Sequence, residues 1–357
     1  RGNLSEEMIR IVIADDSEFF LNVLKGKIES SGKIQVVGSA RNGQEALDLV
    51  KQTKPDLLVL DCQMPVMDGL ESLRRIKHQG VIPVLMLSAL TYEGARTTIQ
   101  ALEYGAADFL HKPTNGADGV NQIVGVLIER IEVLVFQQRL KNIKEKYKSP
   151  PSPTEVIFSE LSAKARSIDL IAMGSSTGGV QAALAIIPRI PAEMKPIVWV
   201  QHMPDKFVQS LAKRLDSMSK IRVKVAEDKE SIHPSVCYLA PAGFQMRLRR
   251  LGEQMTISVH AEEKVSSHCP SCDVLFDSVS EHFTKNVIGV ILSGMGDDGA
   301  RGLEKMHRQG AFVIGQNEDS CVVYGMPKMA YGRGAVDIEL DSKDIAEAVK
   351  RIAGFNF

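Results

Sequence analysis

Apolar and polar positions alternate in a regular way along the first third of the chain. Residues that favour strands gather in five short runs, at residues 9–14, 34–40, 56–60, 83–87 and 107–110. Between these runs, apolar side chains recur every three or four positions, which predicts helices at residues 17–30, 43–51, 70–78 and 93–104 and a last helix from about residue 118. Strands that alternate with helices predict a doubly wound parallel sheet of five strands.

A second alternating series begins near residue 168. The predicted strands lie at residues 168–173, 197–200, 221–226, 237–240, 287–292, 312–315 and 335–338. The predicted helices lie at residues 178–187, 207–218, 274–283, 302–308 and 343–352. Two further strands, at residues 245–250 and 254–259, are close enough to form a hairpin. We therefore expect a second, Rossmann-like α/β domain with an antiparallel insertion.

The helical pattern weakens between the two series. Residues 137–148 are rich in Lys and Gln, and Ser149-Pro-Pro-Ser-Pro153 follows. Prolines interrupt a helix because they lack an N–H group and clash with the preceding turn. The sequence thus predicts domains at residues 8–136 and 167–356, joined by a linker at residues 137–166. A basic docking patch is the alternative interpretation of that linker.

Composition adds several limits. The 357 residues are too many for one ordinary core, and the 43 Lys and Arg nearly balance the 44 Asp and Glu, so net charge favours neither nucleic acid nor membrane binding. No apolar run approaches the roughly 20 residues that span a bilayer. We expect a cytoplasmic protein without membrane insertion and without a nucleic-acid partner.

The five cysteines are odd in number and do not suggest a disulfide framework. Cys269 and Cys272 form a lone C-x-x-C. We expect two free thiols there, and a redox or zinc role is the alternative, which would need a further ligand pair.

Polar side chains follow several strands of the first domain. Asp15 and Asp16 follow the first strand, Asp61 the third, Ser88 the fourth and Lys112 the fifth. Because the carboxyl ends of parallel strands meet at one edge, these groups should converge. Carboxylates suit Mg²⁺, and a lysine and a hydroxyl suit phosphoryl oxygens. The set predicts phosphoryl transfer to a carboxylate.

Residues 8–136 resemble a response-regulator receiver domain. The motifs are Ile13-Ala-Asp-Asp-Ser17, Leu60-Asp-Cys-Gln-Met-Pro-Val-Met-Asp-Gly69, Ser88-Ala89 and His111-Lys-Pro113. The resemblance implies that Asp61 is the phosphoacceptor and that Mg²⁺ is held by Asp15, Asp16, Asp61 and the backbone carbonyl of Gln63. It also implies that the phosphoryl group is sensed by Ser88 and Lys112, with Phe109 as the switch aromatic.

The second domain has its own constellation at strand ends. Ser176 lies in a G-x-S-x-G turn between a strand and a helix, His202 follows the next strand, and Asp297 and Asp298 follow a third. A serine hydroxyl needs a base, and the base needs an orienting group. A glycine-rich turn can also cradle a nucleotide phosphate, but the spacing lacks a Walker lysine and G-x-G-x-x-G. We expect the histidines near the insertion to be surface or structural residues: His233, His260 and His268.

Residues 167–356 resemble the catalytic domain of the CheB methylesterase family. The motifs include Gly174-Ser-Ser-Thr-Gly-Gly179, Gln201-His-Met-Pro204, Pro270-Ser-Cys-Asp-Val-Leu-Phe276 and Gly289-Val-Ile-Leu-Ser-Gly-Met-Gly-Asp-Asp-Gly299. The resemblance implies that Ser176 is the nucleophile, His202 the base and Asp298 the orienting acid, without a cofactor for the ester chemistry. Ser175 and Asp297 are then inactive neighbours. The implied oxyanion donors are the backbone amides of Thr177 and Met295.

The resemblance implies a phosphorylation-activated hydrolase that removes methyl esters from chemoreceptor glutamates and deamidates glutamines, for chemotaxis adaptation. Its expected partners are the methylated cytoplasmic helices of chemoreceptors and a chemotaxis histidine kinase as phosphodonor. Two alternatives remain open: a phosphorylation-switched binding protein whose hydrolase domain is only a scaffold, and an esterase in a chemosensory pathway that does not control flagella.

Overall fold

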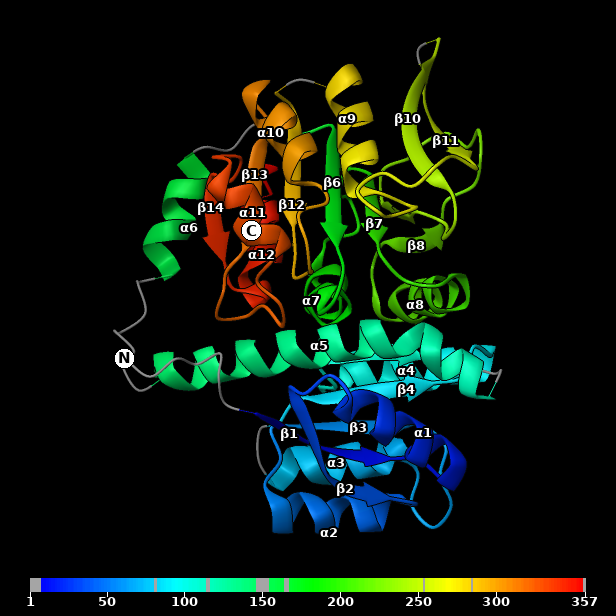
Figure 1. Ribbon diagram of the computed structural model, residues 1–357. Helices are drawn as coiled ribbons and strands as arrows, with labels where there is room; N and C mark the ends of the chain where they lie inside the picture. Colours follow the sequence, from blue (N-terminus) through cyan, green and yellow to red (C-terminus); the bar gives the residue numbers. More distant parts are fainter. Residues whose placement is uncertain are drawn as a thin grey trace. The chain divides into compact units, whose positions relative to one another are not determined.

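The computed structural model describes residues 8–79, 82–113, 116–145, 154–163, 167–252, 254–283 and 285–355. The chain divides into two compact units, Arg1–Lys148 and Ser149–Phe357, each of which is described by itself (Figure 1). No helix within the described ranges is both long enough and apolar enough to cross a membrane. All five cysteines are free thiols, as expected.

The first unit is built on the predicted five-stranded parallel sheet, in the order β2-β1-β3-β4-β5 (Figure 1). Its strands are β1 (Ile9–Ala14), β2 (Ile34–Ala40), β3 (Leu57–Asp61), β4 (Val84–Ser88) and β5 (Asp108–His111). The helices between and after them are α1 (Glu18–Glu29), α2 (Gly43–Thr53), α3 (Gly69–Gln79), α4 (Tyr92–Glu103) and α5 (Gly116–Glu145). The central strands β3 and β4 are buried along their whole length, which explains their continuous apolar sequence.

Side-chain caps set where several of these helices begin. Ser17 accepts a hydrogen bond from the backbone N–H of Phe20 and so caps α1. Thr91 caps α4 in the same way, through the N–H of Gly94. These caps place the preceding strand ends, with Asp15 and Ser88, just before the first helical turns.

The segment predicted as a linker contains helical structure. Helix α5 continues past Phe136 to Glu145, and α6 spans Thr154–Ala163. Residues 137–145 lack a strong apolar stripe but contain Gln, Arg, Lys and Leu, which are good helix formers. The proline-rich stretch at residues 149–153 lies outside the described residues. The domain limits 8–136 and 167–356 therefore stay a prediction.

The second unit is built on a seven-stranded parallel sheet in the order β14-β13-β12-β6-β7-β9-β8 (Figure 1). Its strands are β6 (Leu170–Ser175), β7 (Ile197–Gln201), β8 (Arg222–Val225), β9 (Val236–Leu239), β12 (Val287–Ile291), β13 (Phe312–Gln316) and β14 (Ile338–Leu340). The predicted antiparallel insertion is present as the hairpin of β10 (Gln245–Leu251) and β11 (Gln254–His260).

The remaining helices of the second unit are α7 (Gly179–Ile186), α8 (Asp205–Met218), α9 (Cys272–His282), α10 (Ala300–Arg308), α11 (Met326–Gly332) and α12 (Ser342–Ile352), with a 3-10 turn at Ile187–Arg189. The sequence did not predict α11. It also placed β14 too early, because the N–H of Ala335 closes the last turn of α11 by donating to the carbonyl of Ala330 at 3.1 Å.

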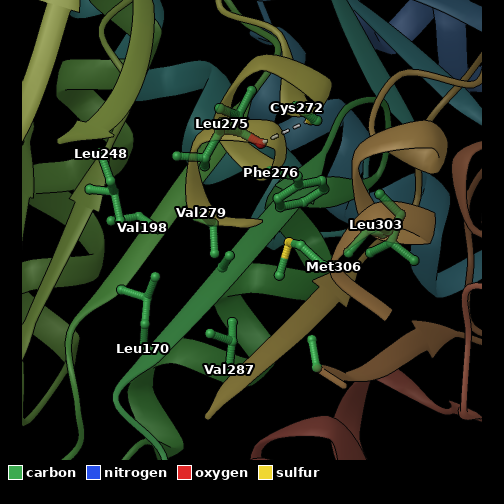
Figure 2. Packing of buried hydrophobic residues seen from close by; sticks show 14 of the residues in the cluster. Leu170, Val198, Leu248, Cys272, Leu275, Phe276, Val279, Val287, Leu303 and Met306 are labelled. Atoms are coloured by element: carbon green, nitrogen blue, oxygen red, sulfur yellow. Dashed lines mark hydrogen bonds between the residues drawn. The ribbon is translucent and has the colours of Figure 1, made fainter. Parts of the chain in front are cut away.

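Helices α9 and α10 pack on the central strands of this sheet and enclose a cluster of buried hydrophobic residues (Figure 2). A Cβ atom on Gly174 of β6 would lie 2.9 Å from the sulfur of Cys272, and one on Gly289 of β12 would lie 2.7 Å from Leu303. The glycines therefore permit the close approach of both helices. The buried cluster includes Leu170, Val198, Leu275, Phe276, Val279, Val287, Leu303 and Met306. This packing fixes the N-terminus of α9 beside the ends of β6 and β7.

Candidate active site and phosphoacceptor site

The carboxyl ends of three neighbouring strands bring the predicted Ser, His and Asp together. Strand β6 lies between β7 and β12. Ser176 follows β6, His202 follows β7, and Asp298 lies in the loop after β12. Backbone hydrogen bonds join the three segments, from Ser176 N to Ser293 O at 3.0 Å and from His202 N to Ser175 O at 3.1 Å. The three residues therefore lie close together at the edge of the sheet where they were predicted to meet.

The turn that carries Ser176 is tight and depends on glycine. Gly178 has φ +81°, in the left-handed region, and a Cβ atom there would lie 2.4 Å from Oγ of Ser293. A Cβ atom on Gly294 would lie 2.9 Å from Cβ of Ser176. The loops after β6 and β12 are thus in direct contact, and Ser176 is only 7% exposed.

The Asp298 carboxylate is held from several sides. Its Oδ2 atom lies 2.8 Å from Nε2 of His202 and accepts the backbone N–H of Cys272 at 2.7 Å. Its Oδ1 atom accepts Oγ–H of Ser271 at 2.6 Å and the N–H of Asp273 at 3.1 Å. These donors form the N-terminus of α9, which favours negative charge. Burial alone would raise the pKa of Asp298, but the hydrogen bonds to His202, Ser271 and Cys272 outweigh it and lower the pKa to about 2.

The second ring nitrogen of His202 is in a different situation. The side chain is 9% exposed, and its Nδ1 atom is buried without a hydrogen-bond partner. A buried polar atom without a partner is costly. Since Nε2 is paired with Asp298, Nδ1 is the atom through which the imidazole can accept a proton.

A buried polar network connects the Ser176 turn to the His202 loop. The indole N–H of Trp199 donates to Oγ of Ser175 at 2.7 Å, and that hydroxyl donates to Oε1 of Gln201 at 2.6 Å. The Gln201 amide then donates to the carbonyl of Ser176 at 2.9 Å and to that of His202 at 3.3 Å. Because carbonyls only accept, the direction of every bond in this network is fixed.

The network also distinguishes Ser175 from its neighbour Ser176, because it engages the hydroxyl of Ser175. Ser175 is fully buried, and its hydroxyl is engaged by Trp199 and Gln201. Asp297, next to Asp298, is exposed. Thr177 is 4% exposed at the turn before α7, and Met295 is partly buried in the loop after β12.

Sequence reasoning missed two residues of this site, His268 and Cys272. His268 was expected to be a surface or structural residue, but its ring stacks on that of His202 with centroids 3.8 Å apart and planes 9° from parallel. The Cys272 sulfur lies 3.8 Å from Nε2 of His202, and its backbone holds Asp298. Only long-range folding of the segment after the hairpin brings His268 here, so no local sequence signal could have found it.

Ligand atoms of His202, His268 and Asp298 lie within 4.8 Å of one another. The lone pairs of two stacked imidazoles lie in nearly parallel planes about one ring thickness apart and so cannot meet at one point, whereas zinc needs ligands that point at a common centre. As arranged, this group does not fit a metal ion.

The predicted phosphoacceptor site is assembled at the carboxyl edge of the first sheet. The Lys112 ammonium lies 2.6 Å from Oδ2 of Asp15 and 2.7 Å from Oδ2 of Asp61. Asp61 is 4% exposed, and burial, with the neighbouring Asp15 charge, raises its pKa despite the lysine. Burial opposes the charge of Lys112, but its bonds to both carboxylates raise its pKa overall.

The carboxylates of this edge fit a magnesium ion. Ligand oxygens of Asp15, Asp16 and Asp61 lie within 4.8 Å of one another, and Asp16 is exposed. Hard oxygen donors with room for water are what Mg²⁺ requires. Gln63 follows directly on this loop, where its N–H approaches Oδ1 of Asp61 at 3.5 Å.

The two remaining predicted residues lie on the neighbouring strands β4 and β5. Ser88 is fully buried and donates to the carbonyl of Gly94 at 3.1 Å. Phe109 is partly buried on β5. Because a hydroxyl donates one hydrogen bond, Ser88 must break its bond to the carbonyl of Gly94 before it can donate to a group on Asp61.

Comparison with known proteins identifies a related family for each of the two units. A family model described as CheB methylesterase matches residues 171–349, and one described as response regulator receiver domain matches residues 11–124. A protein-glutamate methylesterase/protein-glutamine glutaminase of Halalkalibacterium halodurans is 39% identical, with 97% of this chain and 99% of that protein covered. One of Archaeoglobus fulgidus is 38% identical, with 96% and 97% covered.

A solved structure supports the fold of the second unit. The crystal structure of the Thermotoga maritima CheB methylesterase catalytic domain matches with a TM-score of 0.50 and 38% identity, over 52% of this chain and 98% of that one. Fold and sites together define a response regulator whose output domain is a hydrolase. More particularly, the chain belongs to the CheB methylesterase family.

Proposed function

We propose that this chain hydrolyses γ-methyl esters of glutamate side chains on chemoreceptors, with Ser176, His202 and Asp298 as its catalytic triad. The observation that carries the proposal is the His202–Asp298 pair at 2.8 Å, which leaves a buried, unpartnered Nδ1 at the sheet edge that carries Ser176. The relatives' names, protein-glutamate methylesterase/protein-glutamine glutaminase, support the ester and amide substrates.

In the first step, Nδ1 of His202 takes the Ser176 proton while Oγ attacks the γ-carbonyl carbon of the ester. The imidazolium then gives the proton to the departing methoxide, which leaves as methanol, and a glutamyl-serine ester remains. Water, deprotonated by the same nitrogen, hydrolyses that ester and restores Ser176. Glutamine deamidation follows the same route with ammonia as the leaving group.

Asp298 stabilises the imidazolium that forms in each step. Its pKa of about 2 keeps it ionised at neutral pH, and its four donors hold it in place. The backbone amides of Thr177 and Met295, from the two loops in contact at Ser176, are the proposed oxyanion donors. A donor of this kind typically contributes about 3 kcal/mol to lowering the barrier.

In the first unit, Asp61 is the proposed phosphoacceptor, and Mg²⁺ would be held by Asp15, Asp16, Asp61 and the carbonyl of Gln63. When bound, the ion neutralises charge on the phosphoryl group. Lys112, already 2.7 Å from Asp61, would bind a phosphoryl oxygen. Ser88 would turn from Gly94 to another oxygen, and Phe109 would follow into the space released. Phosphorylation would raise the hydrolase activity.

The proposed partners follow from this chemistry. A chemotaxis histidine kinase supplies the phosphoryl group, and the substrates are cytoplasmic helices of methylated receptors. The proposed limits of the receiver domain, linker and esterase domain are residues 8–136, 137–166 and 167–356, and the proposed location is the cytoplasm.

Methanol release from methylated chemoreceptor membranes tests the proposal. Wild type should release methanol, more so with Mg²⁺ and a small phosphodonor. Asp298→Asn should lose most of the activity, whereas the matched variant Asp297→Asn, at the exposed neighbour, should retain it. Absence of release by wild type from a membrane preparation of checked activity would instead favour a phosphorylation-switched binding protein.

A further inference from the structure

A second histidine covers one face of the His202 ring. The His268 and His202 rings are stacked, with centroids 3.8 Å apart and planes 9° from parallel. His268 comes from the segment between β11 and α9, far from β7 in sequence. The two rings therefore meet only in the folded protein.

The His268 ring is itself anchored. Its Nδ1 atom lies 2.6 Å from the carbonyl of Ser266, and because a carbonyl only accepts, Nδ1 carries the proton of the neutral ring. The backbone of His268 is paired with Val265 in both directions, at 3.0 and 2.9 Å, and its carbonyl accepts from the buried Gln245 amide at 3.2 Å. The ring is thus part of a small closed turn and has a defined orientation.

His202, by contrast, makes one strong hydrogen bond through its ring. That bond joins Nε2 to Asp298 at 2.8 Å, while Nδ1 has no partner. That bond fixes the distance between Nε2 and Asp298, but a single bond at one ring edge does not by itself define the plane of the imidazole. Cys272 touches the same nitrogen at 3.8 Å and likewise does not restrain the far side of the ring.

We propose that His268 is a positioning residue for the esterase reaction: its anchored ring holds the plane of the His202 imidazole so that Nδ1 faces the Ser176 hydroxyl. The inference rests on the proposed function of the same site and adds a residue that acts through the base. The His268 ring would raise the reaction rate by orienting His202, because proton transfer from Ser176 requires Nδ1 within hydrogen-bond reach of Oγ.

Burial and the neighbouring His202 favour a neutral His268 during turnover and outweigh the opposing effect of the Asp298 charge. The groups that face the ring pair are Asp298 from the loop after β12, Cys272 from α9 and Lys264 from the segment after the hairpin. Burial, and then the neighbouring His202, lower the pKa of His268. Two imidazolium rings at this separation would repel each other, so the proton taken from Ser176 stays on His202, the ring that is paired with Asp298.

The test compares His268→Ala and His268→Phe in the full-length protein, with His260→Ala as the control histidine on the same insertion. His260 is exposed at the end of β11, where its Nε2 atom lies 4.0 Å from Oδ1 of Asp228. The readouts are methanol release, split into kcat and KM, and the rate at which a fluorophosphonate probe labels Ser176. Fluorescence of Trp199, the single tryptophan, reports whether the second unit remains folded.

We expect His268→Ala to lower kcat and the labelling rate by roughly 10- to 100-fold with little change in KM, as for other losses of orientation. His268→Phe keeps a flat ring and should recover most of the lost rate, whereas His260→Ala should match wild type. In a His202→Ala background, His268→Ala should cause no further loss in either rate, because its effect passes through His202.

Three outcomes would overturn the inference: an unchanged kcat in folded His268→Ala, failure of His268→Phe to recover activity while it remains folded, or an undiminished effect in the His202→Ala background. Failure of the proposed function looks different. In that case wild type releases no methanol, and labelling of Ser176 is insensitive to His202→Ala.

Discussion

Oγ of Ser271 lies 2.6 Å from Oδ1 of Asp298, and so the residue that caps helix α9 also holds the carboxylate that pairs with His202. Ser271 is fully buried and accepts from the N–H of Val274 at 3.4 Å in addition. One side chain thus links the start of the helix to the chemistry. Small changes at the start of α9 should therefore affect activity as well as stability.

Replacing Ser271 with Ala removes both bonds. We expect the free energy of unfolding of the second unit to fall by about 1–2 kcal/mol, as for loss of a helix cap. We also expect kcat for methanol release to fall by roughly 10-fold, because Asp298 loses a charge-assisted hydrogen bond. Ser217→Ala, at an exposed serine of α8, is the matched control. A stable Ser271→Ala variant with the kcat of wild type would contradict the link.

The pH dependence of stability follows from Asp298. Its pKa in the folded protein, about 2, lies below the ordinary value of 3.8. A lowered carboxylate pKa contributes stability that is present above the unfolded value and is lost as the pH falls towards the folded one. Between pH 4 and pH 2, wild type should lose about 2 kcal/mol of unfolding free energy from this group.

Denaturant unfolding followed by Trp199 fluorescence measures this loss. Asp298→Asn should be less stable at pH 6 but should show a shallower decline between pH 4 and pH 2 than wild type. Asp297→Asn, at the exposed neighbour, should follow wild type. Equal declines in all three proteins would show that Asp298 is not held as the contacts indicate.

The Gln201 network predicts different effects for two substitutions of similar size. Gln201→Met removes the amide that donates to the carbonyls of Ser176 and His202. Gln201→Glu replaces that donor with oxygen, which places acceptor against acceptor in a buried site. An unsatisfied buried group costs about 1–3 kcal/mol, so Glu should destabilise the second unit more than Met at neutral pH.

Both substitutions should slow methanol release, since the network connects the nucleophile's turn to the base's loop. The difference between them should narrow at low pH, where a protonated Glu regains a donor. Thermal unfolding at pH 5 and pH 8 checks this. A Gln201→Glu protein as stable as wild type at pH 8 would count against the assigned bond directions.

Removal of magnesium should distinguish the role of the first unit from that of the second. With EDTA, a small phosphodonor should no longer phosphorylate the protein or raise methanol release, because the carboxylates around Asp61 lose their counter-ion. The basal rate of methanol release should be unaffected, since the side chains at the Ser176 site do not fit a metal ion. Asp61→Asn should reproduce the EDTA result with Mg²⁺ present. Loss of basal release with EDTA would contradict this division of roles.

Much of this architecture follows from local sequence. The continuous apolar runs of β3, β4, β6 and β12 define two parallel sheets, and polar residues directly after such strands must meet at one edge. This reasoning placed Ser176, His202 and Asp298 together, and it likewise grouped Asp15 with Asp61.

The features that the sequence did not predict depend on contacts between segments that are distant in the chain. His268 reaches His202 only because the segment after the hairpin folds back over the sheet edge, and the hairpin pattern carries no information about that path. Helix α5 continues to Glu145 on helix propensity without a clear apolar stripe, and Ala335 is taken up by the last turn of α11. The hydrogen-bond donors around Asp298 could not be predicted without knowing the position of α9.

The central claim, that Ser176 is a nucleophile activated by His202 and Asp298, is tested most directly by covalent labelling. Full-length protein is treated with a fluorophosphonate probe, and the modified residue is located by fragment mass spectrometry. We predict a single label on Ser176 that is absent in Ser176→Ala and slowed by at least about 100-fold in Asp298→Asn. A label on the neighbouring Ser175, or labelling that persists unchanged in Ser176→Ala, would contradict the account.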